Sequence, residues 1–326
     1  PSKAVLAAAR GWHAARTAAE RFGGPAVAGE GDFGAVMERM RRIRAEISPA
    51  DSARRFRDEL GVDVFLGHGR FVAGDAVEVD GRRLRFHRAV IATGARAATP
   101  PVPGLADSGY LTNETIFSLT ERPEHLAVIG GGPIGCELAQ AFARFGCRVT
   151  VLEAGPRILP HDDADAAEVV ANALRADGIG LVLDARIEAV AAGGAGKTIR
   201  YSRGGESTEI AASHLLVAAG RAPNVEGLGL DAAGVEVAEK GIRVDERMRT
   251  TNARVFAIGD VASRYQFTHA ADAQARLVVR NALFFGRGRA SDLVIPWCTY
   301  TSPELAHSGL APDDVERSGD EVQTIS

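Results

Sequence analysis

A glycine-rich turn between an apolar strand and a helix is the feature that most constrains the fold of this chain. Residues 126–129 form a short apolar run, and Gly-Gly-Gly-Pro-Ile-Gly follows at once over residues 130–135. Residues 136–145 place apolar side chains at helical spacing, Gly146 is suited to end that helix, and residues 148–153 are typical of a second strand. This order predicts a βαβ unit in a parallel sheet.

The spacing of the glycines predicts a turn that binds a dinucleotide. Gly130 permits the tight turn, Gly132 lets the backbone approach a pyrophosphate, and Gly135 lets the helix pack against the strand. Pro133 and Ile134 belong to the same cofactor site, since they open a helix whose free N–H groups can face phosphate. The alternative is a degenerate βαβ unit that binds nothing.

An acidic residue, Glu153, closes the second strand of this unit. Its carboxylate can accept hydrogen bonds from the hydroxyls of an adenosine ribose, and its charge would repel a 2′-phosphate. NADH is therefore expected in preference to NADPH. Arg157 lies nearby in the sequence and could weaken this repulsion, which leaves NADPH open.

Composition limits the partners of the chain. It has 326 residues, of which 46% are hydrophobic and 25% charged, enough to bury the cores of two or more domains. A formal net charge of −4 gives no basic footprint for nucleic acid and no polybasic membrane anchor. The chain also lacks an apolar run long enough to span a bilayer. We expect a cytoplasmic protein with small-molecule partners.

The cysteines predict neither a disulfide framework nor a metal site. The chain has three, Cys136, Cys147 and Cys298, without CxxC or CxxxxC spacing, and all three are expected to be reduced. Cys136 opens a helix, where a thiolate could be favoured. The interpretation we prefer is a small packed side chain, because free cysteine is commonly buried.

The rest of the chain alternates between helical and strand patterns. Residues 4–21 and 33–60 are predicted to be helical, with Pro49 interrupting the second stretch. Asp80 and Gly81 predict a tight hairpin. The expected strands lie at residues 62–66, 76–79, 83–86 and 89–92. A proline-rich stretch at residues 99–104 predicts a domain boundary.

Taken in order, several segments resemble the pyridine nucleotide-disulfide oxidoreductases, the family of dihydrolipoamide dehydrogenase, glutathione reductase and mercuric reductase. They are the glycine-rich turn with its helix at residues 130–146, the GRxPN turn at 220–224, the flavin-binding motif at 250–260 and an FTxPExA-like strand at 296–306. The resemblance implies an α/β fold with two Rossmann-like, three-layer dinucleotide-binding domains. The FAD domain would be discontinuous and incomplete, and an α+β dimerisation domain would begin near the end of the chain.

This resemblance also implies domain boundaries. They are residues 1–118 for part of the FAD-binding domain, 119–245 for the NAD(P)-binding domain, 246–290 for the returning segment of the FAD-binding domain, and 291–326 for the start of the dimerisation domain.

In the family, FAD is held by strand ends and by the start of one helix. Asp260 would accept a hydrogen bond from the ribityl chain, and a helix starting at residue 268 would direct its N-terminus at the flavin. An N-cap or turn role is the alternative for Asp260. For His269 a structural role is preferred over that of a general base. The cofactor residues implied on the flavin side are Thr93, Gly94, Gly259, Asp260, Thr268, His269 and Ala270. Gly220 is a further implied cofactor residue, in the turn that closes the nicotinamide domain of the family.

Residues 1–6 resemble the segment that directly follows the redox-active CxxxxC disulfide in this family. By that resemblance Lys3 would lie near flavin N5 and pair with Glu137, and we assign both as catalytic. Two solvated charges are the alternative. The first flavin glycines and the CxxxxC are expected outside this chain, so the chain alone should be inactive and hold FAD weakly or not at all. The complete protein is expected to be a homodimer.

The implied activity is that of an FAD-dependent oxidoreductase. Hydride would pass from NADH to FAD, and the reduced flavin would reduce the disulfide to a dithiol. That dithiol would then reduce a small disulfide or a thiol-bound metal ion. A mercuric reductase-like enzyme is preferred, although Glu153 departs from the NADPH preference usual there. The alternatives are a dihydrolipoamide dehydrogenase-like enzyme, an NADH-dependent quinone or flavin reductase without a dithiol, and a non-catalytic nucleotide-binding remnant.

Overall fold

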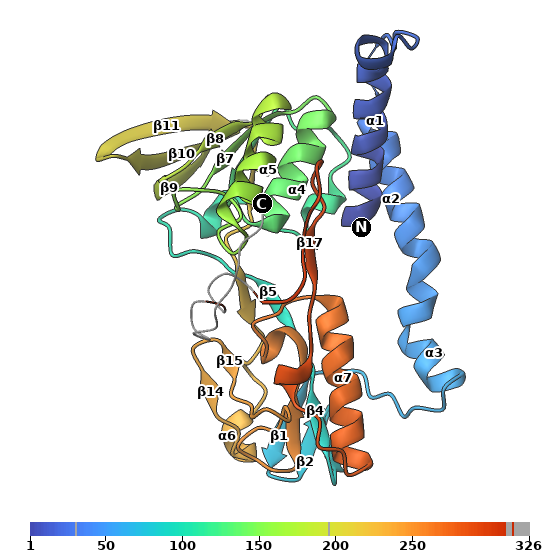
Figure 1. Ribbon diagram of the computed structural model, residues 1–326. Coiled ribbons are helices and arrows are strands. Elements are labelled where there is room, and N and C mark those ends of the chain that lie inside the picture. The colour runs from blue at the N-terminus through green and yellow to red at the C-terminus, as the bar shows by residue number, and fades with distance from the viewer. Residues whose placement is uncertain (30, 195, 311–314, 316–326) are drawn as a thin grey trace. The chain divides into compact units, whose positions relative to one another are not determined.

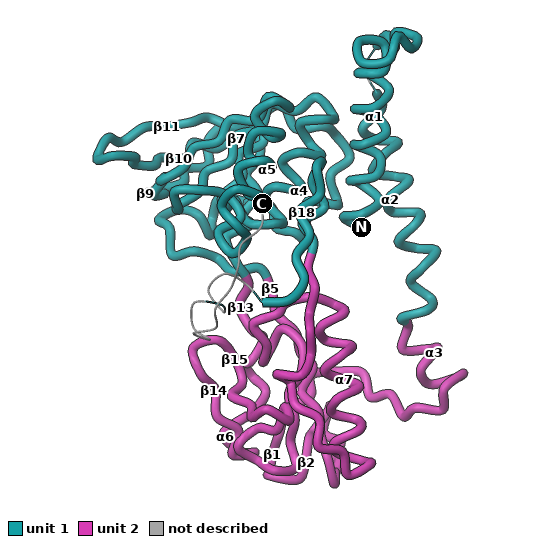
Figure 2. The backbone as a smooth tube through the Cα atoms, in the orientation of Figure 1, with its two compact units in different colours: residues 1–51, 97–220, 298–326 teal, residues 52–96, 221–297 magenta. Residues whose placement is uncertain are grey.

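The structure is a computed structural model that describes residues 1–29, 31–194, 196–310 and 315 (Figure 1). Within this described part, no helix is long and apolar enough to cross a membrane. The chain divides into two compact units (Figure 2). Unit 1 contains residues 1–51, 97–220 and 298–326, and unit 2 contains residues 52–96 and 221–297.

Unit 1 is built on a sheet of four parallel strands in the order β12-β6-β7-β8. The glycine-rich turn joins β6 to α4, and Gly146 follows α4 in a left-handed conformation, so the predicted βαβ unit is confirmed. The bounds are β6 (His125–Ile129), α4 (Pro133–Arg144), β7 (Arg148–Leu152), α5 (Ala164–Ala176), β8 (Gly180–Val182) and β12 (His214–Val217).

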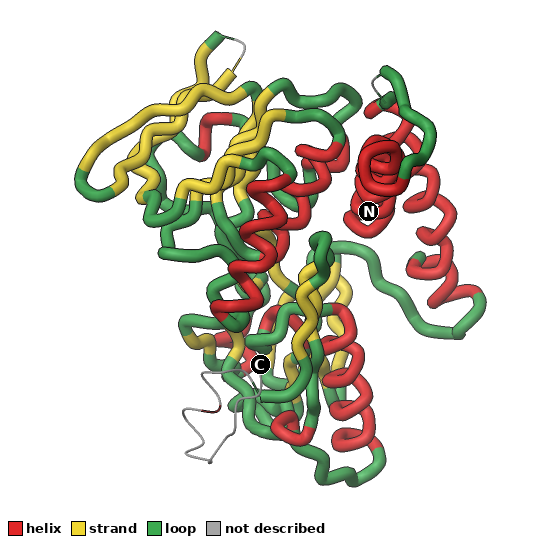
Figure 3. The backbone as a smooth tube through the Cα atoms, turned by 45° about the horizontal axis from the view of Figure 1, so that its top comes forward, coloured by secondary structure: helices red, strands yellow, loops and turns green. Residues whose placement is uncertain are grey.

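Both faces of the sheet are covered by other elements. Successive residues of β6 point to opposite faces, so they show what packs on each side. Leu126 and Val128 belong to a cluster with the helices, whereas Ala127 and Ile129 belong to a cluster with an antiparallel meander. Every residue of β6 is buried, as expected for a central parallel strand. The meander, yellow in Figure 3, has β9 (Arg186–Gly193), β10 (Gly196–Arg203) and β11 (Glu206–Ala212) in the order β11-β10-β9.

Two long helices join the helical layer of unit 1. In α1 (Ser2–Phe22), Val5 is fully buried, and in α2 (Phe33–Ile47), Met37 is fully buried in the same core cluster as the inner face of α4. The carboxylate of Asp32 caps α2 by accepting a hydrogen bond from the N–H of Ala35.

Pro49 interrupts the second helical stretch, as predicted. It lies in the 3₁₀ helix η1 (Ser48–Asp51), and the chain becomes helical again in α3 (Ala53–Asp58), where the hydroxyl of Ser52 accepts a hydrogen bond from the N–H of Arg55. Proline has no N–H to continue the α-helical ladder.

Unit 2 contains a parallel pair of strands, β4 (Ala89–Ile91) and β16 (Val255–Ala257). It also contains an antiparallel sheet in the order β1-β2-β3, and the turn between its last two strands has positive φ at both Asp80 and Gly81. This is the hairpin turn that the sequence predicted. The strands of the sheet are β1 (Gly69–Ala73), β2 (Ala76–Val79) and β3 (Arg82–Arg85).

The longest helix of unit 2 is α7 (Thr268–Leu283), and its buried Leu277 and Val278 pack with Phe256 of β16. The remaining elements of the described chain are short. They are β5 (Ala95–Ala97), η2 (Ala106–Ser108), η3 (Ile116–Ser118), β13 (Arg221–Pro223), α6 (Leu230–Ala233), β14 (Val237–Ala238), β15 (Gly241–Ile242), η4 (Gly259–Val261), η5 (Ala290–Asp292), β17 (Trp297–Thr299) and β18 (Leu305–His307).

One predicted strand is wrong. Residues 62–66 form no strand, and Val62, Phe65 and Leu66 are exposed there, so the run lacks both a partner strand and a buried face. The strand that completes this sheet is β1, which starts at Gly69. The two units also follow boundaries other than those of the predicted domains, whose assignment remains a prediction.

Candidate functional site

The three glycines of the turn have different surroundings in unit 1. A Cβ at Gly130, where φ is 108°, would overlap the carbonyl oxygen of Ala218, and a Cβ at Gly135 would overlap the carbonyl oxygen of Gly130. These two glycines are therefore required by packing. A Cβ at Gly132 would meet no atom within 4 Å. The middle glycine thus faces open space, where a ligand can approach the backbone.

The turn leads directly into the N-terminus of α4. Gly132 is the N-cap, no side chain in the described part of the protein caps the helix, and Pro133 occupies the first turn, where its missing N–H costs nothing. Pro133 is exposed, and Ile134 packs partly against the main core cluster. The unpaired N–H groups of this turn form a place for an anion beside the open space at Gly132.

Glu153 lies just beyond β7 and connects two loops at the carboxyl edge of the sheet. Its Oε2 accepts a hydrogen bond of 2.6 Å from the N–H of Gly131, and its Oε1 accepts one of 2.7 Å from the N–H of Gly155. A carboxylate has about four acceptor sites, so two remain for a ligand. Gly131 and Gly155 hold the predicted site residue Glu153, and the sequence reasoning did not select them, although they lie within two residues of residues that it did select.

Arg157 is directed at its own loop. Its guanidinium donates to the carbonyl oxygens of Leu159 at 2.7 Å and Pro160 at 2.8 Å. In the described chain it forms no ion pair with Glu153, so nothing neutralises that carboxylate directly.

Gly220 follows β12 close to the glycine-rich turn. The N–H of Ala218 donates to the carbonyl oxygen of Ile129, which continues the pairing of β12 with β6 up to this edge of the sheet. Gly220 has a φ of 106°, and a Cβ there would meet nothing within 4 Å. The structure therefore gathers the predicted NAD(P) residues of unit 1 at one edge: Gly130, Gly132, Pro133, Ile134, Gly135, Glu153 and Gly220.

Lys3 and Glu137, the predicted catalytic residues, both contact Tyr300. The Glu137 Oε1 accepts a hydrogen bond of 2.9 Å from the Tyr300 N–H, and the Lys3 Nζ lies 4.5 Å from the centroid of the Tyr300 ring. Burial raises the pKa of Glu137, and the Tyr300 N–H together with the charges of Lys3 and Arg10 partly opposes this. Within the described residues, Lys3 and Glu137 form no direct ion pair.

The predicted flavin residues of unit 2 meet at the carboxyl ends of β4 and β16. Gly259, at a φ of 69°, donates its N–H to the buried Oε1 of Gln274 on α7, so the strand end is tied to the helix. Asp260 forms an ion pair of 3.1 Å with Arg221, and both side chains are mostly buried. The Arg221 guanidinium also donates to the carbonyl oxygen of Ala95, while its buried Nε has no hydrogen-bond partner among the described residues.

Thr93 and Gly94 form the other side of this strand end. The hydroxyl of Thr93 donates to the carbonyl oxygen of Asn224 at 2.8 Å, and the amide of Asn224 donates back to the carbonyl oxygen of Thr93 at 2.9 Å. Gly94 has a φ of 67°, and a Cβ there would meet nothing within 4 Å. Asn224 and Arg221, both in the turn recognised from the sequence, thus hold residues on either side of the strand end.

The start of α7 holds Thr268, His269 and Ala270. Ala270 is fully buried, and the His269 ring stacks on Phe267 with 5.4 Å between centroids. The His269 Nε2 lies 2.6 Å from the carbonyl oxygen of Pro296, so this nitrogen carries the proton and donates it. These contacts fit the structural role that we expect for His269.

The residues of both units fit the cofactors that the sequence implies. Open space at Gly132 suits a pyrophosphate, and the open space at Gly94 together with the orphaned Arg221 Nε suits a polar ligand at the second strand end. Cys136 fits the alternative we preferred for it, since it is fully buried and burial raises the pKa of its thiol. No cluster of metal-ligating side chains occurs among the residues that the structure describes.

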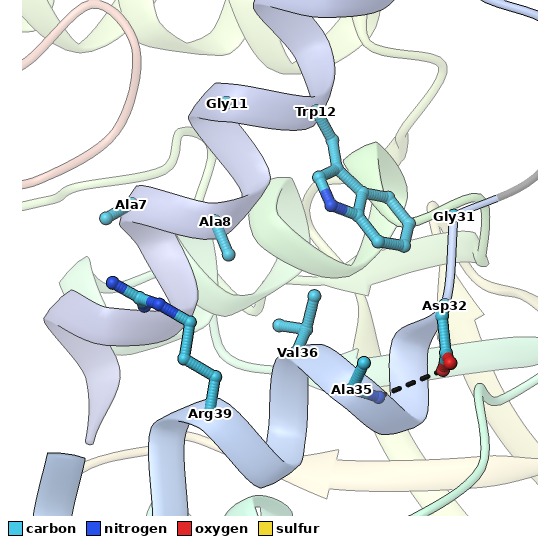
Figure 4. A pocket seen from close by; sticks show the side chains of 9 residues that line it. All are labelled: Ala7, Ala8, Gly11, Trp12, Gly31, Asp32, Ala35, Val36 and Arg39. Atoms are coloured by element: carbon cyan, nitrogen blue, oxygen red, sulfur yellow. Dashed lines mark hydrogen bonds between the residues drawn. The ribbon is translucent and has the colours of Figure 1, made fainter. Parts of the chain in front are cut away.

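A separate groove of about 540 Å³ lies between α1 and α2 (Figure 4). None of the predicted site residues lines it. Its lining is mostly small or apolar, with one acidic and one basic side chain: Ala7, Ala8, Gly11, Trp12, Gly31, Asp32, Ala35, Val36 and Arg39.

A parallel sheet with a glycine turn, a helix N-terminus and an acidic residue at the next strand end defines a dinucleotide-binding α/β protein. Comparison with known proteins identifies the family within this class. Residues 1–275 match the family described as pyridine nucleotide-disulphide oxidoreductase, and the chain belongs to that family.

Among curated relatives, a mercuric reductase from Bacillus cereus is 37% identical over 268 residues, covering 82% of this chain and 42% of the relative. A dihydrolipoyl dehydrogenase from Mycobacterium tuberculosis is 31% identical and covers 99% of this chain and 70% of the relative. The solved structure of the HOCl-induced flavoprotein disulfide reductase RclA from Escherichia coli matches with a TM-score of 0.85 at 28% identity, covering 99% and 70% of the two chains. The chain thus spans less than half the length of the Bacillus cereus relative.

Proposed function

We propose that this chain is part of an FAD-dependent oxidoreductase that takes hydride from NADH and delivers the electrons to a disulfide. The observation that carries the proposal is the turn of unit 1. Its middle glycine, Gly132, faces open space beside an uncapped helix N-terminus. This combination is what a pyrophosphate needs from a protein, namely close backbone approach and unpaired N–H donors.

NADH is the proposed nucleotide because of Glu153. The hydrogen bonds from the N–H groups of Gly131 and Gly155 fix its carboxylate at the strand end. The remaining acceptor sites suit the ribose hydroxyls, and the negative charge opposes a 2′-phosphate. Arg157 would relieve this repulsion only by releasing the two carbonyl oxygens that it binds.

FAD is proposed for the strand ends of unit 2. Asp260 would accept a hydroxyl hydrogen bond while its ion pair with Arg221 keeps the carboxylate oriented. The N-terminus of α7 would stabilise negative charge on the flavin, and the Gln274 bond to Gly259 holds that helix at the strand end. FAD, when bound, would supply the two-electron chemistry between nicotinamide and disulfide.

For the final acceptor we propose a thiol-bound metal ion, as in a mercuric reductase. Support comes from the mercuric reductase relative at 37% identity. A disulfide substrate, as in a dihydrolipoamide dehydrogenase-like enzyme, is the second candidate, because that relative matches 99% of this chain. The complete protein is proposed to act as a cytoplasmic homodimer.

The test of the nucleotide site uses two alanine substitutions in unit 1. Gly132→Ala adds a methyl group where the fold has room and a bound pyrophosphate does not, so NADH affinity should fall at least about tenfold while the fold is kept. Gly193→Ala is the matched control, since its Cβ also meets nothing within 4 Å, at the end of β9. Isothermal titration with NADH gives both dissociation constants. Equal affinity of the parent and Gly132→Ala, or no NADH binding by the parent, would reject the proposal.

A further inference from the structure

Tyr300 lies between two residues of opposite charge in unit 1. Its ring faces the Lys3 ammonium, 4.5 Å from nitrogen to centroid, and its backbone N–H donates to the Glu137 carboxylate at 2.9 Å. A cation at this distance from an aromatic ring is attracted to the ring face. One residue therefore contacts both members of the expected charge pair, and it does so with two different groups.

The position of Tyr300 is fixed by the backbone around it. Arg10 on α1 donates to the carbonyl oxygens of Tyr300 and Thr301, each at 3.2 Å. Gln140 on α4 accepts from the N–H of Ser302 at 2.7 Å and donates to the carbonyl oxygen of the same residue at 3.0 Å. Because α1 and α4 both hold this segment, the ring is presented to Lys3 from a fixed backbone.

The side chain of Lys3 has few other contacts that could restrict it. Its side chain is exposed, and no hydrogen bond or ion pair is formed by it within the described chain. A free lysine side chain samples many rotamers, and ordering it costs conformational entropy. The ring of Tyr300 is the contact that limits this freedom.

We propose that Tyr300 is a positioning residue, which holds the Lys3 ammonium with its ring and the Glu137 carboxylate with its N–H. This inference adds a residue to the proposed function. It rests on that function only where it places Lys3 and Glu137 near the flavin. In this arrangement the two charges contact the same residue and, within the described chain, not each other, so the ammonium stays available to a neighbouring electron-rich group.

The test measures the reactivity of Lys3 by competitive acylation and mass spectrometry. The chain has three lysines, and Lys197 and Lys240 serve as internal references in every sample. Tyr300→Leu removes the ring but keeps the backbone N–H, and it should raise the acylation rate of Lys3 relative to both references by about two- to fivefold. Tyr300→Phe keeps the ring face and should match the parent.

A matched control is Tyr265→Leu, which removes a ring that lies 4.7 Å from the Arg264 guanidinium in unit 2. It should leave the relative rate of Lys3 unchanged. An unchanged Lys3 rate in Tyr300→Leu would overturn the proposal, and so would a Phe variant that behaves like the Leu variant.

A second measurement needs no substitution. In the parent protein with ¹³C-dimethylated lysines, the Lys3 signal should lie upfield of the Lys197 and Lys240 signals, because its nitrogen lies over a ring. Three coincident signals would contradict the contact even if the Leu variant failed to fold. NADH titration of the same samples separates the two claims, since loss of nucleotide binding in the parent would reject the proposed function and leave the Lys3 result intact.

Discussion

Each carboxylate oxygen of Glu153 accepts a hydrogen bond from a different backbone N–H group. Gly131 belongs to the turn after β6, and Gly155 belongs to the loop after β7, so one side chain joins the ends of two neighbouring strands. Hydrogen bonds to a charged group contribute about 1.5–3 kcal/mol each. The residue therefore has a structural contribution that is separate from its proposed contact with ribose.

Glu153→Ala should reduce the discrimination between NADH and NADPH. It removes the charge that repels a 2′-phosphate, and we expect the ratio of the two dissociation constants to change by about tenfold or more. Glu153→Gln is the companion variant, since it loses the charge but keeps an acceptor for one N–H. Titration of both nucleotides against both variants measures the effect, and an unaltered ratio would remove Glu153 from the nucleotide site.

The thiols should differ in reactivity. Burial raises the pKa of the Cys147 thiol to about 12 and that of Cys136 still further, whereas Cys298 is only partly buried. At pH 8 a thiol with a pKa of about 12 is thiolate in roughly one molecule in 10⁴. Cys298 should react first with a thiol reagent, and the other two only on unfolding. Rapid modification of Cys136 in the folded protein would contradict this.

At the scale of elements, the first turn of α4 is needed for packing, apart from its proposed role in nucleotide binding. The Cβ that alanine would place at position 135 overlaps the carbonyl oxygen of Gly130, so helix and strand could not keep their present separation. This close approach is a property of the whole βαβ unit. The third glycine of the turn, Gly135, therefore differs from the second, Gly132, which has room for a Cβ.

Gly135→Ala should therefore destabilise the protein by about 1–3 kcal/mol, as expected for an added methyl group without room. Gly193→Ala, at an open position, should change the free energy of unfolding by less than about 0.5 kcal/mol. Urea denaturation followed by circular dichroism compares them. Equal stabilities of the two variants would show that the turn relaxes freely.

The elements that were predicted correctly are determined by residues that are neighbours in the sequence. Pro49 removes a helical donor, and Asp80 with Gly81 adopts the positive φ angles of a tight hairpin, so both were predicted correctly from a few neighbouring residues. The run at residues 62–66 has the composition of a strand and forms none. Strand formation needs a partner, and the partner of β2 is supplied instead by β1.

At the scale of the whole molecule, three histidines that are buried or partly buried couple stability to pH. Burial is the main cause that lowers the pKa of His13, His125 and His214 in the folded protein. The unfolded chain, with an ordinary histidine pKa of about 6.5, then binds more protons than the folded protein as the pH falls below that value.

The free energy of unfolding should therefore decrease from pH 7 to pH 5.5, by no more than about 1.4 kcal/mol per histidine and pH unit. Glu137 acts in the opposite direction at lower pH, since its pKa is raised in the folded protein. His13→Gln, His125→Gln and His214→Gln should each make the decrease smaller. Thermal or urea unfolding across this range provides the measurement, and stability that rises on acidification would contradict it.

The sequence by itself determined the βαβ unit, the family resemblance and the identity of the residues at each strand end. These follow from short-range rules, because glycine spacing and strand periodicity act over a few residues. Gly132 and Glu153 could be selected in this way without any structure.

Only the tertiary structure decided what those residues contact. The bond from Gly131 to Glu153, the ion pair of Asp260 with Arg221 and the meeting of Lys3 and Glu137 at Tyr300 join residues far apart in the chain. No local pattern encodes such contacts, because they exist only once the sheets and helices have packed and brought those segments together.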